Sequence, residues 1–292
     1  MNCILVIIVI ILITNQESFM KYLSSFFLIL LCLSVIGCKD SGTQVQGTGS
    51  PTYPTSLNNE WEYQTVTTIS YYNHSGGIDS TSSENSDNAI IKVIKTNDSL
   101  KNYKGLVKFE SYEKLSPNNI TYSWYQNSDT SFITIAYFNP SDRTIEPKRN
   151  SNNHYLTIAE FKKMNYLILP EFGKPEKTLS DSIQYYDIPR KVLAYPLSTS
   201  ATWVELYTPF YRERYVNNYV QTTAISQQFG CYEIKVRWPG FRIEFNDYVS
   251  LNSGLIKREI ISDSVQYTSG DNPDDGRFSK IHTTTTLIRK NF

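Results

Sequence analysis

The feature that most constrains the fold is a period-two alternation of large apolar and polar residues. Between residues 61 and 71, one face of the alternation collects Trp61, Tyr63, Thr65, Thr67, Ile69 and Tyr71. A half-buried strand places successive side chains on opposite faces, so this run predicts a strand with one buried face. Further strands are expected over 89–96, 103–114, 120–127 and 130–138. The gaps between them are short and polar, which predicts hairpins and antiparallel pairing.

The C-terminal third continues the pattern. Residues 231–238 alternate so that Ile234 and Trp238 share one face and Cys231 lies on the polar face. After residue 245 the alternation slips by one, which predicts a β-bulge at Asn246 and Asp247. Strands are also expected near 255–267 and 279–290, and the chain holds 22 Tyr and 14 Phe, residue types that favour strands.

The middle of the chain is less regular. Thr157 and Glu160 have the spacing of a capping box, which predicts a short helix over 158–165. Prolines divide the segment 170–196, so we expect it to cross the surface without regular structure. The polar stretch 73–88 reads as a long loop.

The N-terminus carries two apolar runs, at 3–13 and 22–37, separated by a polar gap. Crossing a bilayer as a helix takes about 20 apolar residues, so neither run is a comfortable span. The second run follows Lys21 and ends in Gly37 and Cys38, the order of a signal peptide with a small residue at its cleavage point. Val35-Ile36-Gly37-Cys38 resembles the bacterial lipobox, which signal peptidase II cleaves just before a cysteine that carries acyl chains. The alternative is an N-terminal membrane anchor with an incidental cysteine.

This resemblance implies a chain organisation and a location. Translation is expected to start at Met20, with residues 1–19 upstream of the true start and 20–37 as signal peptide. Cys38 would carry diacylglycerol and an N-linked acyl chain, and residues 38–56 would form a flexible tether to a β-rich domain over 57–292. Lys39, in place of Asp, argues by the same resemblance for the outer membrane, in its periplasmic or surface leaflet. The expected partner is therefore a membrane, contacted through the lipid.

Charge and cysteine content exclude several classes of function. The 28 basic and 28 acidic residues balance, so nothing indicates an electrostatic surface for nucleic acid. Of the four cysteines, Cys3 and Cys32 precede the expected cleavage and Cys38 is used by lipid. Cys231 then remains alone, which excludes an intramolecular disulfide or a cysteine metal cluster in the mature chain.

No catalytic, cofactor or metal site is predicted. The three histidines, His74, His154 and His282, have no metal-ligand spacing, and HExxH and GxSxG are absent. The stretch 271–276 matches a calcium loop at only a few positions and reads as a hairpin turn. The four tryptophans are read as core residues, Cys231 as structural, and the carboxylates as solvated, although a paired glycosidase site has no fixed spacing.

A second resemblance covers residues 195–260. The blocks Gly230-Cys231-Tyr232 and Gly254-Leu255-Ile256-Lys257 are similar to those of bacterial envelope lipoproteins of unknown function, with a departure at Ser200-Ala201. The resemblance implies a mainly β fold: one antiparallel, strongly bent sheet, an open or partial β-barrel like lipoprotein carriers, with at most one or two short helices. A β-sandwich is the alternative, and a proline-tryptophan echo leaves open two similar halves, 57–150 and 190–292.

These expectations combine into a non-catalytic cell-envelope lipoprotein that binds a hydrophobic molecule or another envelope component. A surface hydrolase acting on glycan or peptide, and a glycan-binding module, are the alternatives.

Overall fold

The computed structural model describes residues 52–73, 75–138, 183–207, 211–239, 242–266 and 278–292. These residues belong to one compact unit, Ser50–Phe292. They contain strands and no helix: β1 (Glu60–Tyr72), β2 (Ile78–Asn85), β3 (Ala89–Leu100), β4 (Tyr103–Glu113), β5 (Ser116–Asn127), β6 (Ser131–Phe138), β7 (Gln184–Ala194), β8 (Thr202–Leu206), β9 (Arg212–Ala224), β10 (Gln227–Arg237), β11 (Glu244–Ser250), β12 (Gly254–Gln266) and β13 (Phe278–Lys290).

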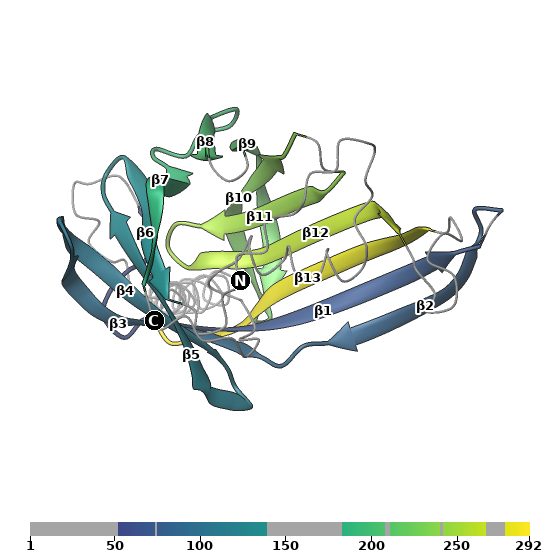
Figure 1. The fold of residues 1–292 in the computed structure, drawn as a ribbon, viewed down its shortest axis with the longest axis horizontal. Helices are drawn as coiled ribbons and strands as arrows, with labels where there is room; N and C mark the ends of the chain where they lie inside the picture. The colour runs from purple at the N-terminus through teal and green to yellow at the C-terminus, as the bar shows by residue number, and fades with distance from the viewer. Residues whose placement is uncertain (1–51, 74, 139–182, 208–210, 240–241, 267–277) are drawn as a thin grey trace, which may run out of the picture. The chain divides into compact units, whose positions relative to one another are not determined.

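All the strands belong to one antiparallel sheet, which confirms the predicted fold class and rules out two stacked sheets. Its order is β7-β6-β5-β4-β3-β1-β13-β12-β11-β10-β9-β8, with β2 paired to β1 off this path. Most neighbours are consecutive in the chain and joined by short turns, as the sequence predicts. Figure 1 shows the sheet strongly bent, so that β3–β7 face β9–β13.

The bent sheet nearly closes on itself, with one seam between β7 and β8. These two strands stand at opposite ends of the sheet order, and in the described residues no backbone ladder joins them. Side chains bridge the seam instead: Arg190 Nε donates to Glu205 Oε1 at 2.7 Å, and Trp203 Nε1 donates to the Lys191 carbonyl at 3.0 Å. A barrel closed in this way buries one face of every strand around a common interior.

Strand β1 crosses the middle of the sheet and pairs with three partners. It pairs with β3 near Trp61, with β2 beyond Val66, and with β13 along most of its length. The sequence predicts which face of β1 is buried, and the structure confirms it, since Trp61 and Tyr63 are each 1% exposed. Thr65 and Thr67 continue that face and bond to threonines of β13, which satisfies their hydroxyl groups inside the sheet.

The core formed by the described residues has one main cluster and two smaller ones. The main cluster joins residues of both halves of the chain, from Trp61 and Phe109 to Cys231 and Leu287. The smaller clusters lie around Trp238 and around Trp124. All four tryptophans are buried, as predicted: Trp61 and Trp203 belong to the main cluster, and Trp238 and Trp124 to the two smaller ones.

Two segments that the sequence predicts to be irregular form strands, because the backbone hydrogen bonds between strands need no apolar side chain. The stretch 73–88, expected to be a loop, contains β2, whose residues are all exposed and which pairs with β1. Segment 184–194, expected to lack structure, is β7, at the sheet edge. Pro189 is tolerated there because the β6–β7 ladder is irregular between Thr134 and Ala136. The predicted helix over 158–165 lies outside the described residues.

Two details of the last third are also corrected. Cys231 is fully buried, whereas its place in the alternation predicts the polar face. The ladder between β9 and β10 shifts between Glu233 and Ile234, so the inward phase of β10 changes there and both Cys231 and Ile234 point inward. In β11 the shift lies between Tyr248 and Val249 instead of at Asn246 and Asp247.

The folded part begins before residue 57, the boundary that composition predicts. Tyr53 packs against the main core cluster and stacks on Phe132 with ring centroids 4.8 Å apart. Its backbone N–H donates to Tyr195 Oη at 2.8 Å. The C-terminal end of the expected tether is therefore part of the domain, and the proposed duplication of the halves stays a prediction.

Gly254 is expected to be the most sensitive glycine of the described residues. It has a φ of +87°, and an added Cβ would lie 2.9 Å from both Trp61 Nε1 and Tyr53 Oη. Gly254→Ala therefore combines left-handed strain of about 1–2 kcal/mol with overpacking of about 1–3 kcal/mol. Gly105, at φ +69° with nothing within 4 Å of an added Cβ, is the matched control.

Urea unfolding of the two variants measures the difference. Gly105→Ala should lose only the backbone part, about 1–2 kcal/mol, and Gly254→Ala should lose about 2 kcal/mol more. Equal losses in the two variants would mean that Trp61 and Tyr53 move aside at no cost.

Candidate functional site: a buried charge cluster beside an apolar cavity

In the part of the chain that the structure describes, six charged side chains lie inside the bent sheet, each at most 4% exposed. They come from five strands: Arg190 of β7, Glu205 of β8, Arg212 and Arg214 of β9, Asp247 of β11 and Arg258 of β12. Each occupies an inward position of its strand, where alternation brings it to the same interior as the apolar core. Buried charge is costly unless it is paired and hydrogen-bonded, so the arrangement of these groups decides what they can do.

Glu205 is the centre of the cluster near the seam. Arg190 reaches its Oε1 from β7, and Arg212 reaches both oxygens, with Nη2 and Nε each 2.8 Å away. Arg214 also contacts both oxygens, at 2.9 Å from Nη2 and 2.7 Å from Nε. One carboxylate therefore holds three guanidinium groups from strands on both sides of the seam.

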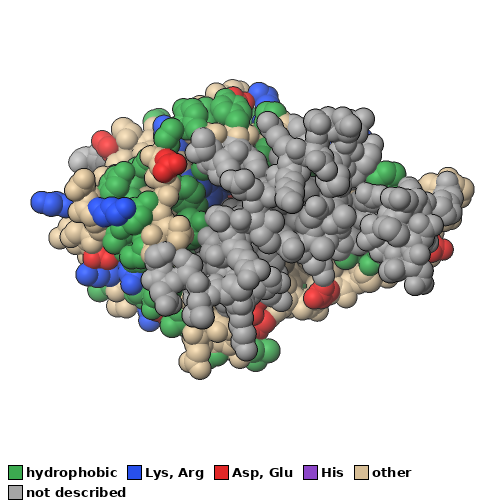
Figure 2. Space-filling model, viewed as in Figure 1, with side chains coloured by type: hydrophobic (Ala, Val, Ile, Leu, Met, Phe, Trp, Pro, Cys, Tyr) green, Lys and Arg blue, Asp and Glu red, His purple; other side chains and the backbone are tan. Residues whose placement is uncertain are grey.

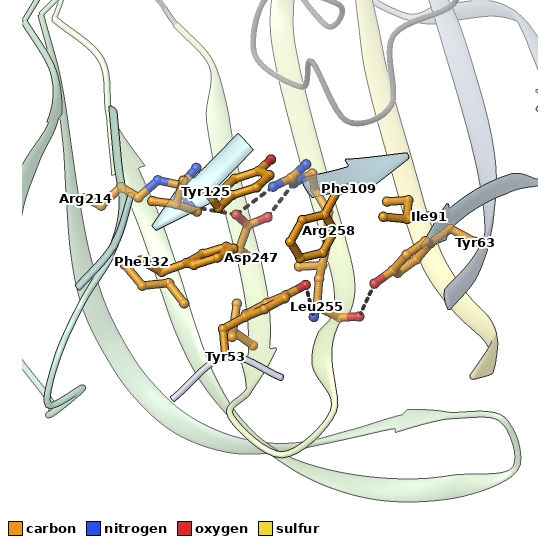
Figure 3. A pocket seen from close by; sticks show the side chains of 13 residues that line it. Tyr53, Tyr63, Ile91, Phe109, Tyr125, Phe132, Arg214, Asp247, Leu255 and Arg258 are labelled. Atoms are coloured by element: carbon orange, nitrogen blue, oxygen red, sulfur yellow. Dashed lines mark hydrogen bonds and ion pairs between the residues drawn. The ribbon is translucent and has the colours of Figure 1, made fainter. Parts of the chain in front are cut away.

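Asp247 is the second anion and lies between two arginines (Figure 3). Arg214 Nη1 donates to its Oδ2 at 2.7 Å, and Arg258 Nη2 donates to the same oxygen at 2.9 Å while Arg258 Nε donates to Oδ1. Phe245 lies beside both cations, with guanidinium carbons 5.5 Å (Arg214) and 4.9 Å (Arg258) from its ring centroid. Arg214 thus links the Glu205 and Asp247 groups into one network.

The network holds both carboxylates ionised. Burial alone would raise the pKa of Glu205, but Arg212, Arg214 and Arg190 outweigh it and hold this pKa well below its usual value. The pKa of Asp247 is lowered in the same way, against burial, by Arg258 and Arg214. Burial lowers the pKa of Arg212 to about 10, whereas the two carboxylates outweigh burial and raise the pKa of Arg214.

A cavity of about 60 Å³ adjoins the Asp247 end of this network. Its lining comes from both halves of the bent sheet and from the residue before β1 that stacks on Phe132: Tyr53, Tyr63, Ile91, Phe109, Tyr125, Phe132, Val192, Leu193, Arg214, Asp247, Val249, Leu255 and Arg258. The close view shows aromatic rings gathered beside the Arg214–Asp247–Arg258 group (Figure 3). The cavity therefore has an aromatic and aliphatic wall and one charged wall.

The aromatic wall is ordered by ring contacts and by hydrogen bonds to the backbone. Phe132 stacks on Tyr125 at 4.6 Å between centroids, and Tyr125 meets Phe109 edge-on at 4.9 Å. Tyr63 Oη donates to the Leu255 carbonyl at 2.9 Å, and Tyr53 Oη accepts from the Leu255 N–H at 3.3 Å. Part of the hydroxyl capacity of this wall is therefore used by the protein backbone.

The sequence-predicted functional residues lie elsewhere. Gly37 and Cys38, His74, His154 and the turn 271–276 are outside the described residues. His282 lies on β13 with its Nε2 3.8 Å from Glu259 Oε1, and its side chain is 40% exposed. Cys231 is a buried thiol whose pKa burial raises to about 11, which agrees with its structural reading.

The charge cluster is the site that sequence reasoning missed. In an alternating strand a charged residue is normally assigned to the solvent face, and the carboxylates are read in that way from the sequence. One position of the sequence does indicate the cluster. If Asp247 is assigned to the inward face of its strand, Phe245, Asp247 and Val249 alternate without interruption, and no bulge at 246–247 is needed.

Within the described ranges, no helix is long and apolar enough to cross a bilayer, and no group of three or more His, Cys, Asp or Glu residues is placed to hold a metal ion.

Comparisons with known proteins give distant structural similarity alone. No family model matches the chain, and no curated protein matches it. A provisionally assigned exported protein with a YmcC-like fold from Bacteroides fragilis is 11% identical, with a TM-score of 0.34 over 83% of this chain and 100% of that one. A provisionally assigned lipoprotein from Parabacteroides distasonis is also 11% identical, with a TM-score of 0.27 over 84% of this chain and 100% of that one.

Proposed function

We propose that this chain is a bacterial cell-envelope lipoprotein, anchored through lipid on Cys38, whose β domain binds a small hydrophobic molecule in the cavity beside Asp247. The cavity is the observation that carries the binding part of the proposal. In the alternative form of this proposal, the surface of the β domain binds another envelope component.

The location rests on the order of sequence elements before the domain. A basic residue, an apolar run, Gly37 and Cys38 follow one another as in a lipobox, and the polar residues after Cys38 leave room for a tether up to Tyr53. One acyl chain holds a protein to a bilayer only marginally, while two or more hold it stably. Lipid on Cys38 would therefore keep the domain at a membrane, with the outer membrane favoured by Lys39.

The proposed binding role is supported by the composition of the cavity inside the domain. Ligand pockets are typically concave, mostly apolar and supplied with a few polar groups that orient the ligand. The cavity has this composition, because aromatic and aliphatic side chains make most of its wall and Arg214, Asp247 and Arg258 make the rest.

The absence of catalysis is part of the proposal and has its own support. The two buried carboxylates of the charge cluster, Glu205 and Asp247, are each held by at least two arginines. Their lowered pKa values make both poor proton donors at neutral pH. Such groups are suited to fixing a structure or a ligand.

Cys38→Ala is expected to abolish acylation and release the protein from membranes. The experiment is metabolic labelling with a fatty-acid probe, followed by separation of membrane and soluble fractions. Cys231→Ala is the matched control, since that thiol is fully buried in the core and should leave the label unchanged. Full labelling of Cys38→Ala would refute the anchor.

Native mass spectrometry of protein purified from its own host tests the binding role. We expect an apolar molecule to copurify with the protein and to be lost from Val249→Leu, which extends a buried side chain of the cavity wall by one methylene group. Tyr248→Phe is the control, because Tyr248 is turned the other way on β11 and donates to Glu259 at 3.0 Å. A ligand retained equally by both variants would place binding outside the cavity.

The second candidate function is a surface hydrolase or a glycan-binding module. One observation favours the hydrolase. His282 and Glu259 approach one another on partly exposed positions, and Tyr248 donates to the same carboxylate. His282→Ala should then remove any hydrolytic activity found on glycan or peptide substrates, and unchanged activity would exclude this pair.

A further inference from the structure

We infer that the ligand of the cavity is a short apolar molecule that ends in a carboxylate, with the carboxylate placed against Arg214 and Arg258. This inference rests on the proposed ligand-binding function and names the chemical class of the ligand.

The charges of the cavity wall favour an anion. Among the lining residues, Arg214 and Arg258 are cations and Asp247 is the anion, so positive groups outnumber negative ones two to one. Both cations are at most 3% exposed, where surrounding water screens their charge least. A ligand cation placed at this wall would meet two guanidinium groups and one carboxylate.

Arg214 has the hydrogen-bond capacity for such a ligand. A guanidinium carries five N–H donors, and it binds carboxylates in a planar, two-bond geometry. The three nitrogens of Arg214 each approach Glu205 or Asp247, through Nε, Nη1 and Nη2. Each Nη atom carries a second hydrogen, and these two are not used in those contacts.

The charged wall is held in position by contacts within the protein. Asp247 fixes the distance between the two arginines by bonding to both, and Phe245 packs against both guanidinium groups. Glu205 holds the other side of Arg214. A ligand carboxylate therefore meets donors whose side-chain entropy has been lost on folding, which is the condition for tight binding by few atoms.

The rest of the cavity determines the remainder of the ligand. Phe109, Tyr125, Phe132 and Val249 present carbon surface, and the tyrosine hydroxyls of Tyr53 and Tyr63 already bond to the Leu255 backbone. A polar tail would lose hydrogen bonds with water at this wall, so an alkyl tail is favoured. The volume of about 60 Å³ is well below the roughly 150 Å³ of an engineered cavity that accepts benzene, which limits the buried tail to a few carbon atoms.

A charge series on the wild-type domain tests this inference without any change to the arginines. Butyrate, 1-butanol and butylammonium share one alkyl chain and differ in the end group. Titration of each into labelled protein, followed by NMR chemical-shift changes, gives three dissociation constants. Butyrate should bind at least about tenfold more tightly than 1-butanol, because a charge-assisted hydrogen bond is stronger than a neutral one, and butylammonium should not bind.

The outcomes separate this inference from the proposed function. If 1-butanol binds as tightly as butyrate, the carboxylate preference is wrong while apolar binding stands. If none of the three binds, the inference is wrong, and the native mass spectrum decides the proposed function by itself. Val249→Leu should weaken butyrate binding at least about tenfold through loss of space, with Tyr248→Phe unchanged. Equal butyrate binding by both variants would place the carboxylate elsewhere and overturn the inference.

Discussion

Glu205→Gln is expected to destabilise the domain by about 3–5 kcal/mol, which is the usual cost of removing one partner of a buried ion pair. The substitution keeps the size of the side chain and removes its charge. Arg190, Arg212 and Arg214 would then face a neutral amide in an interior where each is at most 4% exposed. The loss falls on the seam, because Arg190 of β7 and Glu205 of β8 bridge the two ends of the sheet.

The measurement is denaturant unfolding of Glu205→Gln beside Glu213→Gln. Glu213, on the next strand, pairs with Arg237 at 3.3 Å, and the side chains of this pair are 67% (Arg237) and 32% (Glu213) exposed. Exposed pairs contribute about 0–1 kcal/mol, so this control should change little. Equal effects of the two substitutions would show that the buried cluster does not hold the seam.

The strands and the single sheet could be predicted from the sequence because both depend on local pattern. Trp61, Tyr63 and Ile69 repeat at a spacing that only a half-buried strand satisfies, and they are buried as predicted. Strand β2 could not be found in this way, since a strand whose residues are all exposed leaves no periodic apolar signal. Its hydrogen bonds to β1 are formed by the backbone, which every sequence shares.

The candidate site could not be predicted because its residues are far apart in the chain and break the polar-outward rule. Arg190 and Asp247 meet the same network only because the sheet bends until β7 lies beside β8. A single sequence shows no such closure. The register shift between β9 and β10 could not be predicted for a similar reason: Cys231 and Ile234 both point inward because of a change in this ladder, which side-chain alternation does not record.

The same cluster would join the proposed binding role to a structural role. Charged side chains in a buried cavity wall need partners of opposite charge, and Asp247 is that partner for Arg214 and Arg258. Those arginines also connect β9, β11 and β12 across the interior. The residues proposed to orient a ligand therefore also stabilise the sheet, and tests on binding must separate the two roles, as the charge series does.

Acidification is expected to unfold the domain below about pH 4, and the direction follows from the two buried carboxylates. The folded-state pKa values of Glu205 and Asp247 are below their ordinary values, because Arg190, Arg212 and Arg214 surround the first, and Arg214 and Arg258 the second. A carboxylate with a lowered folded pKa contributes stability above its unfolded pKa, about 3.9 for Asp and 4.3 for Glu. That stability is lost as the pH falls from there through the folded pKa.

The test is the urea midpoint measured between pH 7 and pH 2, at low salt and again at about 0.5 M NaCl. The stability that Glu62 contributes to the domain is also lost in acid, since its hydrogen bonds with Lys114 and Arg289 lower its pKa to about 2. Those two partners are more than half exposed, so salt should screen their contribution, while the buried groups are screened much less. A steep acid loss that persists in high salt is the result expected if Glu205 and Asp247 are its main source. A midpoint unchanged down to pH 3, or an acid loss removed by salt, would show that the arginines do not hold these two carboxylates ionised.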